Sequence, residues 1–251
     1  RSYMFTQATS AFNNFKRNMP VIKRKANFDG LREVIGKASH SAIKTFLDLY
    51  ANHFQIRTVQ GITEKLSMKW RFTKIKNSNR WLFERWERNG TGLGLFYDEN
   101  KDRDDVVDNF FGATGNSKSF DSFGVHGVGE TAAYESLKGS DGDSFLACNK
   151  QSDDTHVEIF EYDGIEIEAG LKLKVEDAVK SGLPMDEVGE RGLYTRYTIS
   201  SENVAGFNET NFYDILSTEV GSRYGESIKK GLLDFEIEVI SDTGEIIFND
   251  T

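Results

Sequence analysis

Cysteine, proline and long apolar runs are scarce in this sequence. The 251 residues include one cysteine and two prolines. A single cysteine cannot close a disulfide within the chain, and it excludes a cysteine-rich zinc module. The scarcity of cysteine suits a reducing compartment, so we expect an intracellular protein, cytoplasmic or nuclear. No apolar run approaches the roughly 18 residues that a membrane-spanning helix needs, so we expect no membrane partner.

Charge is unevenly divided along the chain. The net charge is −9, but residues 1–90 carry 18 basic and 6 acidic side chains, whereas residues 91–251 carry 13 basic and 34 acidic ones. Such a split is typical of proteins whose basic part contacts nucleic acid or phosphate. The alternative is that the two oppositely charged parts neutralise each other within one fold.

Composition and pattern divide the chain into three segments. Residues 1–26 contain a basic cluster and a proline, which favours a basic N-terminal arm or strap. Residues 27–205 carry periodic apolar patterns and glycine-rich loops, and we expect the main domain there. Residues 206–251 read as a helix and a hairpin that complete the same domain.

The spacing of apolar residues predicts three longer helices and a hairpin. Residues 29–37, 40–55 and 211–230 have apolar side chains three to four positions apart, as in amphipathic helices. Residues 66–75 alternate apolar and polar side chains, and an Asn-Ser-Asn turn separates them from a similar run that starts at Trp81. This pattern indicates two antiparallel strands.

The remaining alternating runs are short and predict a sheet. Residues 171–181 fit either a short helix or an extended loop. Further strands are expected at residues 144–149, 156–162, 164–168, 192–200, 233–240 and 245–249. The order of elements indicates an α/β sandwich in which a mixed, mostly antiparallel sheet has helices on one face.

Asp48 and Asn52 form the first candidate site. Their spacing of four places both side chains on one face of the expected helix. A carboxylate can orient or deprotonate water, and an amide oxygen can coordinate a hard cation such as Mg2+. The alternative is an ordinary solvated helix face.

The second candidate is Asn89-Gly90-Thr91-Gly92, directly after the expected hairpin. Glycines let the backbone approach a ligand closely and adopt positive φ. The alternative is an ordinary turn, because Asn-Gly is a frequent turn dipeptide.

The third candidate is a glycine-rich stretch that ends at a predicted helix starting near residue 129. Residues 112–119 contain Ser117 and Lys118 as donors, and residues 123–129 carry three glycines at the helix N-terminus. Free backbone N–H groups and the helix dipole favour a phosphate there. The spacing matches neither a Rossmann nor a Walker loop, and a purely structural loop is the alternative.

Taken in order, these three motifs resemble those of the GHKL ATPases, which include gyrase, the ninety-kilodalton heat-shock chaperones, histidine kinases and MutL. The resemblance covers roughly residues 28–200. The stretch Phe-Phe-Gly-Ala-Thr-Gly-Asn-Ser-Lys-Ser followed by Phe-Gly-Val-His-Gly-Val-Gly-Glu-Thr-Ala-Ala is most similar to the MORC-like branch. The resemblance implies a Bergerat-type sandwich that buries ATP under a mobile lid, with Mg2+ bridging the phosphates.

The resemblance also implies roles for individual residues. Asp48 would take the place of the catalytic acid, and Asn52 would bind Mg2+. Thr195 corresponds to a late threonine near the adenine. The adenine motif would comprise Arg88, Asn89, Gly90 and Gly92, and the phosphate loops would comprise Gly112, Ser117, Lys118, Gly124, Val125, His126, Gly127, Val128 and Gly129.

The sequence departs from the family pattern at three positions. Asp48 is shorter than the usual glutamate, and Gln55 replaces an acidic residue. Arg88 stands where the family has an aspartate that accepts a hydrogen bond from adenine, and an arginine has only donors. Two functions therefore stay open. One is a slow Mg2+-dependent ATPase that couples lid closure to dimerisation or clamp formation; the other is an inactive pseudo-ATPase that serves as an interaction or scaffold module.

Two partners follow from these expectations. Lid closure implies a homodimer formed through the N-terminal arm and the lid. The basic N-terminal region, which includes Lys23, Arg24 and Lys25, is a candidate DNA contact. Tryptophans alternate with basic residues over 69–86, which suits either single-stranded nucleic acid or, more commonly, a core face opposite a solvated basic face.

Overall fold

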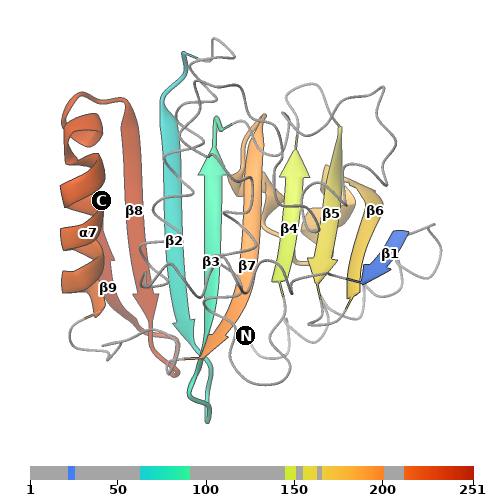
Figure 1. Ribbon diagram of the computed structural model, residues 1–251, viewed down its shortest axis with the longest axis horizontal. Coiled ribbons are helices and arrows are strands. Elements are labelled where there is room, and N and C mark those ends of the chain that lie inside the picture. The colour runs from blue at the N-terminus through green and yellow to red at the C-terminus, as the bar shows by residue number, and fades with distance from the viewer. Residues whose placement is uncertain (1–21, 26–62, 91–144, 151–154, 163–165, 201–211) are drawn as a thin grey trace.

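The computed structural model describes residues 22–25, 63–90, 145–150, 155–162, 166–200 and 212–251. Their strands form one nine-stranded sheet in the order β1-β6-β5-β4-β7-β3-β2-β8-β9 (Figure 1). The pair β2–β8 is parallel, and the other pairs of described strands are antiparallel. The expected α/β fold with a mixed, mostly antiparallel sheet is therefore confirmed.

The bounds of most strands match the expected ones to within two residues. The strands are β1 (Ile22–Lys25), β2 (Leu66–Lys74), β3 (Arg80–Arg88), β4 (Phe145–Lys150), β5 (His156–Tyr162), β6 (Glu166–Lys174), β7 (Gly192–Ser200), β8 (Leu233–Ile240) and β9 (Ile246–Asp250). The helices are α6 (Val175–Lys180), the short 3-10 helix η3 (Met185–Glu187) and α7 (Phe212–Lys229). The helices expected at 29–37 and 40–55 lie outside the described residues.

Strands from distant parts of the sequence meet in this one sheet. β1, from the expected arm, pairs with β6 at one edge, and β8 and β9 extend the other edge beside β2. The expected β2–β3 hairpin turns at Asn77, whose φ is 58°, and the Ile75 N–H donates to the Arg80 carbonyl at 3.0 Å. Within the described helices, none is both long and apolar enough to cross a membrane.

One face of the sheet, here called the Thr195 face, holds an aromatic core. The ring centroid of Trp70 on β2 lies 5.3 Å from that of Phe83 on β3 and 5.2 Å from that of Phe235 on β8. Phe72 stacks on Phe83 at 4.4 Å. Such pairs each contribute about 0.5–1.5 kcal/mol beyond their buried area. Because strand side chains alternate between the two faces, the same face includes Thr195 on β7.

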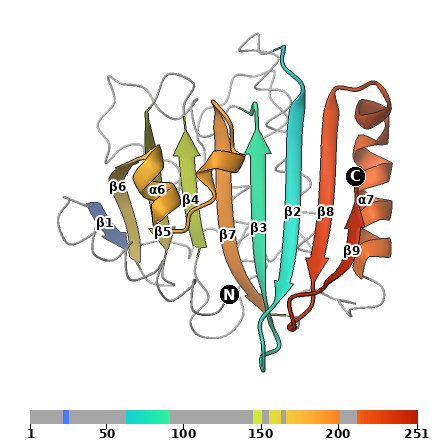
Figure 2. The same ribbon diagram turned by 180° about the vertical axis from the view of Figure 1, so that it is seen from behind.

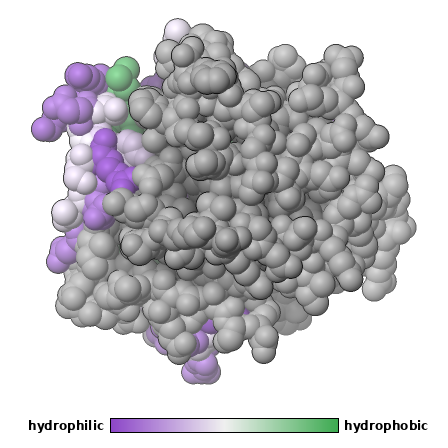
Figure 3. Space-filling model, in the orientation of Figure 1, coloured by the Kyte–Doolittle hydropathy of each residue, from purple (hydrophilic) through white to green (hydrophobic). Residues whose placement is uncertain are grey.

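Helix α7 covers the Thr195 face at the β8 edge. Tyr224 on α7 stacks on Phe235 with the ring centroids 6.5 Å apart, and Val220 one turn earlier is also buried. The two views place α7 in front of β8 and β9 in Figure 1 and behind them in Figure 2. The surface on the α7 side is largely hydrophilic in Figure 3, as expected for an amphipathic helix.

The opposite face, here called the Trp86 face, is covered by α6 and η3 (Figure 2). Its buried cluster combines Ala178 on α6, Met185 on η3 and Trp86 on β3 with apolar residues of β4, β5, β6 and β7. Cys148 belongs to this cluster and is fully buried, where it packs as a small hydrophobic side chain. The described helices α6 and α7 thus lie on opposite faces of the sheet, so the expectation of helices on one face is wrong for the part of the chain described.

Candidate functional site

Four of the predicted site residues are described: Arg88, Asn89 and Gly90 at the end of β3, and Thr195 on β7. Thr195 lies near that end of the sheet, because its neighbour across the strands is Arg85. The four residues thus lie toward the same end of the sheet, although Arg88 and Thr195 are on opposite faces of it. The other predicted residues lie outside the described part of the chain: Asp48, Asn52, Gly92, Gly112, Ser117, Lys118, Gly124, Val125, His126, Gly127, Val128 and Gly129.

Asn89 forms a left-handed turn that ends β3. Its φ is 60°, a conformation that asparagine tolerates better than most residues. Its N–H donates to the Arg191 carbonyl at 3.0 Å, and its side-chain amide donates to the Lys65 carbonyl at 2.9 Å. The turn is thus tied both to the residues before β7 and to the residue before β2.

Gly90 follows in tight contact with Glu87. A Cβ atom on Gly90 would lie 1.5 Å from the Glu87 carboxylate oxygen Oε1. Gly192 is equally confined, since its Cβ would lie 1.9 Å from the Glu87 carbonyl oxygen. Gly192 therefore requires glycine, because the β3 backbone leaves no space for a Cβ atom, whereas a Cβ atom at Gly90 would have to displace the Glu87 side chain.

Thr195 has a fully buried side chain between Arg85 on β3 and Ala147 on β4. Its hydroxyl is shielded from solvent, and no hydrogen-bond partner for it exists among the residues that the structure describes. Burying a hydroxyl without a hydrogen bond costs about 1–3 kcal/mol in protein mutational data. Most buried polar side-chain atoms in native structures have a hydrogen-bond partner, so a buried hydroxyl without one among the described residues is an exception.

Glu87 lies on the same face as Thr195 and is also fully buried. Its neighbour on β7 is Leu193, two residues before Thr195, so Glu87 and Thr195 are diagonal neighbours across the strands. The sequence motif does not include Glu87, because this residue lies one position before it. Burial in β3 stops alternating at the consecutive buried residues Arg85, Trp86 and Glu87, but this pattern is visible only in the structure.

Further buried polar residues share this face. Arg85, Asn149 on β4 and Glu158 on β5 are buried, and Asn149 pairs with Leu193 on one side and Glu158 on the other. Each of the three has an interaction partner. With Glu87 and Thr195 they form a polar floor, which interrupts the otherwise apolar Thr195 face at the end of the sheet where β3 stops.

Arg88 lies on the opposite side of the sheet from Glu87 and Thr195. Its guanidinium donates from Nε and Nη2 to the Glu187 carbonyl, at 2.9 and 2.5 Å. This placement follows from strand geometry, since consecutive residues of β3 point to opposite faces. At the end of β3, the acidic group on the Thr195 side is therefore the carboxylate of Glu87.

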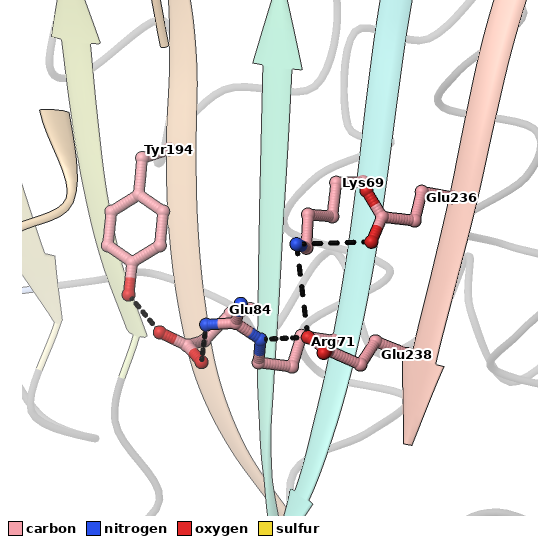
Figure 4. Close-up of polar contacts among 6 residues, drawn as sticks. All are labelled: Lys69, Arg71, Glu84, Tyr194, Glu236 and Glu238. Atoms are coloured by element: carbon pink, nitrogen blue, oxygen red, sulfur yellow. Dashed lines mark hydrogen bonds and ion pairs between the residues drawn. The ribbon is translucent and has the colours of Figure 1, made fainter. Parts of the chain in front are cut away.

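The Trp86 face carries a charge network beyond the area that α6 covers (Figure 4). Arg71 Nε lies 2.5 Å from Glu238 Oε2, and its Nη1 lies 3.9 Å from Glu84 Oε2. The Tyr194 hydroxyl donates to Glu84 Oε1 at 2.7 Å, and the Arg71 guanidinium lies 4.8 Å from the Trp86 ring centroid. These groups satisfy one another within the sheet, which indicates a structural role.

Burial controls ionisation in this network. Desolvation raises the pKa of Glu84 above its ordinary value of 4.5, although the Tyr194 hydrogen bond and Arg71 oppose the shift. Burial also raises the pKa of Tyr194 well above 10.

The three tryptophans Trp70, Trp81 and Trp86 are all buried, so the tryptophan-rich hairpin is core and offers no open stacking platform.

The described residues contain no cluster of metal-binding side chains. Among them, no three His, Cys, Asp or Glu side chains form a group that could hold a metal ion. Asn52, the predicted Mg2+ ligand, lies outside this part of the chain. At the end of the sheet where β3 stops, the Glu87 carboxylate can accept hydrogen bonds, and the Thr195 hydroxyl can donate or accept one.

Comparison with known proteins supplies no family. No protein-family model matches the chain, and no curated protein matches it significantly.

Proposed function

We propose that this chain is a nucleotide-binding domain of the GHKL type, which binds a purine nucleoside triphosphate with Mg2+. ATP is the nucleotide that the resemblance implies. The observation that carries the proposal is the buried hydroxyl of Thr195, which has no hydrogen-bond partner among the described residues. It shares a face with the buried carboxylate of Glu87, two residues before the Asn89-Gly90 turn.

The chemistry of these groups suits an adenine base. An ionised carboxylate is an acceptor only, so Glu87 can accept a hydrogen bond from the exocyclic amino group. The Thr195 hydroxyl can donate to a ring nitrogen or hold a bridging water. Glu87 thus supplies the acceptor that Arg88 lacks, since the two residues are adjacent in β3 but lie on opposite faces.

The remaining parts of the proposed site come from the resemblance. Asn52 would hold Mg2+, and the glycine-rich loops at 112–119 and 123–129 would surround the phosphates. Asp48 would orient the attacking water. Hydrolysis would be slow because it would be tied to closure of a lid over residues 93–122 and to dimerisation or clamp formation. DNA contact through the basic N-terminal region would be one output of that cycle.

Isothermal titration with ATP and Mg2+ tests the proposal. We expect saturable binding that weakens when Glu87→Gln removes the negative acceptor. Glu84→Gln is the matched control, because Glu84 lies on the same strand and on the Trp86 face. Absence of binding at millimolar nucleotide, or equal losses in both variants, would overturn the proposal.

Phosphate release separates the two functions that stay open. Turnover that is lost in Asn52→Ala supports a working ATPase, because that residue would hold the metal at the phosphates. Binding without turnover in the wild-type protein supports the pseudo-ATPase instead.

A further inference from the structure

A short strap crosses the end of the sheet beside the proposed site. This strap, which is distinct from the N-terminal arm, consists of residues 187–191, from the last residue of η3 to the residue before β7. Two cations hold its main chain: Arg88 donates twice to the Glu187 carbonyl, and Lys150 Nζ donates to the Gly189 carbonyl at 2.6 Å. Hydrogen bonds from charged donors are roughly twice as strong as neutral ones, so these contacts anchor the main chain of the strap.

The register of the sheet places the two cations at the same level on either side of β7. Arg88 on β3 and Lys150 on β4 both pair with Gly192, the first residue of β7. They therefore flank the point where the strap enters the sheet, one on each side. Gly189 has a φ of 79°, which bends the strap, and its Cβ would lie 3.3 Å from the Arg88 side chain.

The strap in turn holds the turn that ends β3. The Arg191 carbonyl accepts the Asn89 N–H at 3.0 Å. Arg191 Nη2 also lies 3.4 Å from Glu64 Oε2, next to Lys65, whose carbonyl accepts the Asn89 side chain. A displaced strap would thus release one of the two hydrogen bonds that fix Asn89, and Gly90 would no longer be pressed against Glu87.

We propose that Arg88 and Lys150 are positioning residues, which lock the strap so that the Asn89-Gly90 turn stays closed over Glu87. This inference rests on the proposed nucleotide site and deepens it. It assigns Arg88 a role without contact to the base. Arg88 and Lys150 then raise the nucleotide affinity indirectly. A turn that is already ordered in the free protein loses no conformational entropy when the nucleotide binds.

Two measurements on Arg88→Met and Lys150→Met test the lock. Methionine keeps the apolar stem of each side chain and removes the donors. Amide hydrogen exchange of the nucleotide-free protein should accelerate at Asn89 in both variants. The Kd for Mg-ATP should rise about two- to thirtyfold, the range for substitutions that act without touching the ligand. Arg88→Lys should recover part of the affinity, since it keeps one donor.

Arg80→Met is the matched control, because Arg80 lies on β3 at the far end from the strap. It should change neither the exchange nor the affinity. Unchanged exchange at Asn89 in both variants overturns the lock, and so does faster exchange with an unchanged Kd. If the wild-type chain binds no nucleotide, the proposed function fails, and the exchange measurement still decides whether the strap holds the turn.

Discussion

Thr195→Val should stabilise the nucleotide-free protein and weaken nucleotide binding. Valine has nearly the shape of threonine and replaces the hydroxyl by a methyl group. The Thr195 hydroxyl is fully buried and has no hydrogen-bond partner among the described residues, so its removal should break no bond there. Few substitutions in a core are expected to move stability and binding in opposite directions.

The structure sets the size of both effects. An unpaired buried hydroxyl costs about 1–3 kcal/mol, so the free energy of unfolding should rise by about 1 kcal/mol or more. For a chain of this size, 1 kcal/mol corresponds to a Tm increase of about 2–4 °C. A hydrogen bond to the base is worth about 0.5–1.5 kcal/mol, so its loss should raise the Kd about two- to tenfold.

Urea unfolding and nucleotide titration of the same preparations measure the two effects. Thr198→Val is the matched control, since Thr198 lies on the same strand but on the Trp86 face and is only half-buried. A Thr195→Val protein that is less stable than wild type would show that the hydroxyl has a structural partner. A stabilised variant with unchanged affinity would refute the assignment of Thr195 to the base.

Four other substitutions or reactions have defined outcomes. Gly90→Ala places a Cβ 1.5 Å from Glu87 Oε1, so urea unfolding should show a loss of about 1–3 kcal/mol, accompanied by weaker nucleotide binding. Gly225→Ala on α7 meets no atom within 4 Å and should raise the free energy of unfolding by about 0.5–1 kcal/mol. The pKa of Glu84 is raised, so the folded state favours its neutral carboxyl group. The stability that this group contributes is therefore present below pH 4.5 and is lost as the pH rises through the raised pKa. Glu84→Gln should flatten that decline when the free energy of unfolding is measured across pH. Cys148 is fully buried with its pKa raised to about 12, so a thiol reagent should label it only at the rate of unfolding.

Each of these outcomes can fail in a specific way. If Gly90→Ala does not lower the free energy of unfolding, the Glu87 side chain does not pack against Gly90 as described. A pH profile that is identical in wild type and Glu84→Gln would show that Glu84 titrates alike in both states. Rapid labelling of Cys148 in the native protein would mean that β4 opens locally.

The strands were predictable where one face is buried and the other is not. In β2 the apolar residues from Leu66 to Phe72 alternate strictly with polar ones, and this pattern defines the strand to within a residue. β6 was less predictable: the sequence indicated a strand at 164–168 and a short helix or an extended loop over 171–181, yet pairing with β5 extends the strand to Lys174, where α6 follows directly. Pairing between distant segments leaves no local signal.

The site was predictable as a motif, and its geometry was not. Asn89 and Gly90 are turn residues, and the sequence alone predicts a turn after β3. Which neighbouring side chain shares a face with Thr195 depends on the register of β3 against β7, and that register selects Glu87 over Arg88. The strap contacts of Arg88 were equally hidden, because they join residues 99 positions apart.

A structure of the protein with Mg2+ and a non-hydrolysable ATP analogue would show whether the base contacts Glu87 and Thr195. We predict that the polar edge of the base lies within hydrogen-bond distance of the Glu87 carboxylate and the Thr195 hydroxyl, with the Asn89-Gly90 turn closed as described. A base bound elsewhere, or a complex in which Glu87 and Thr195 contact only protein, would refute the proposed nucleotide site.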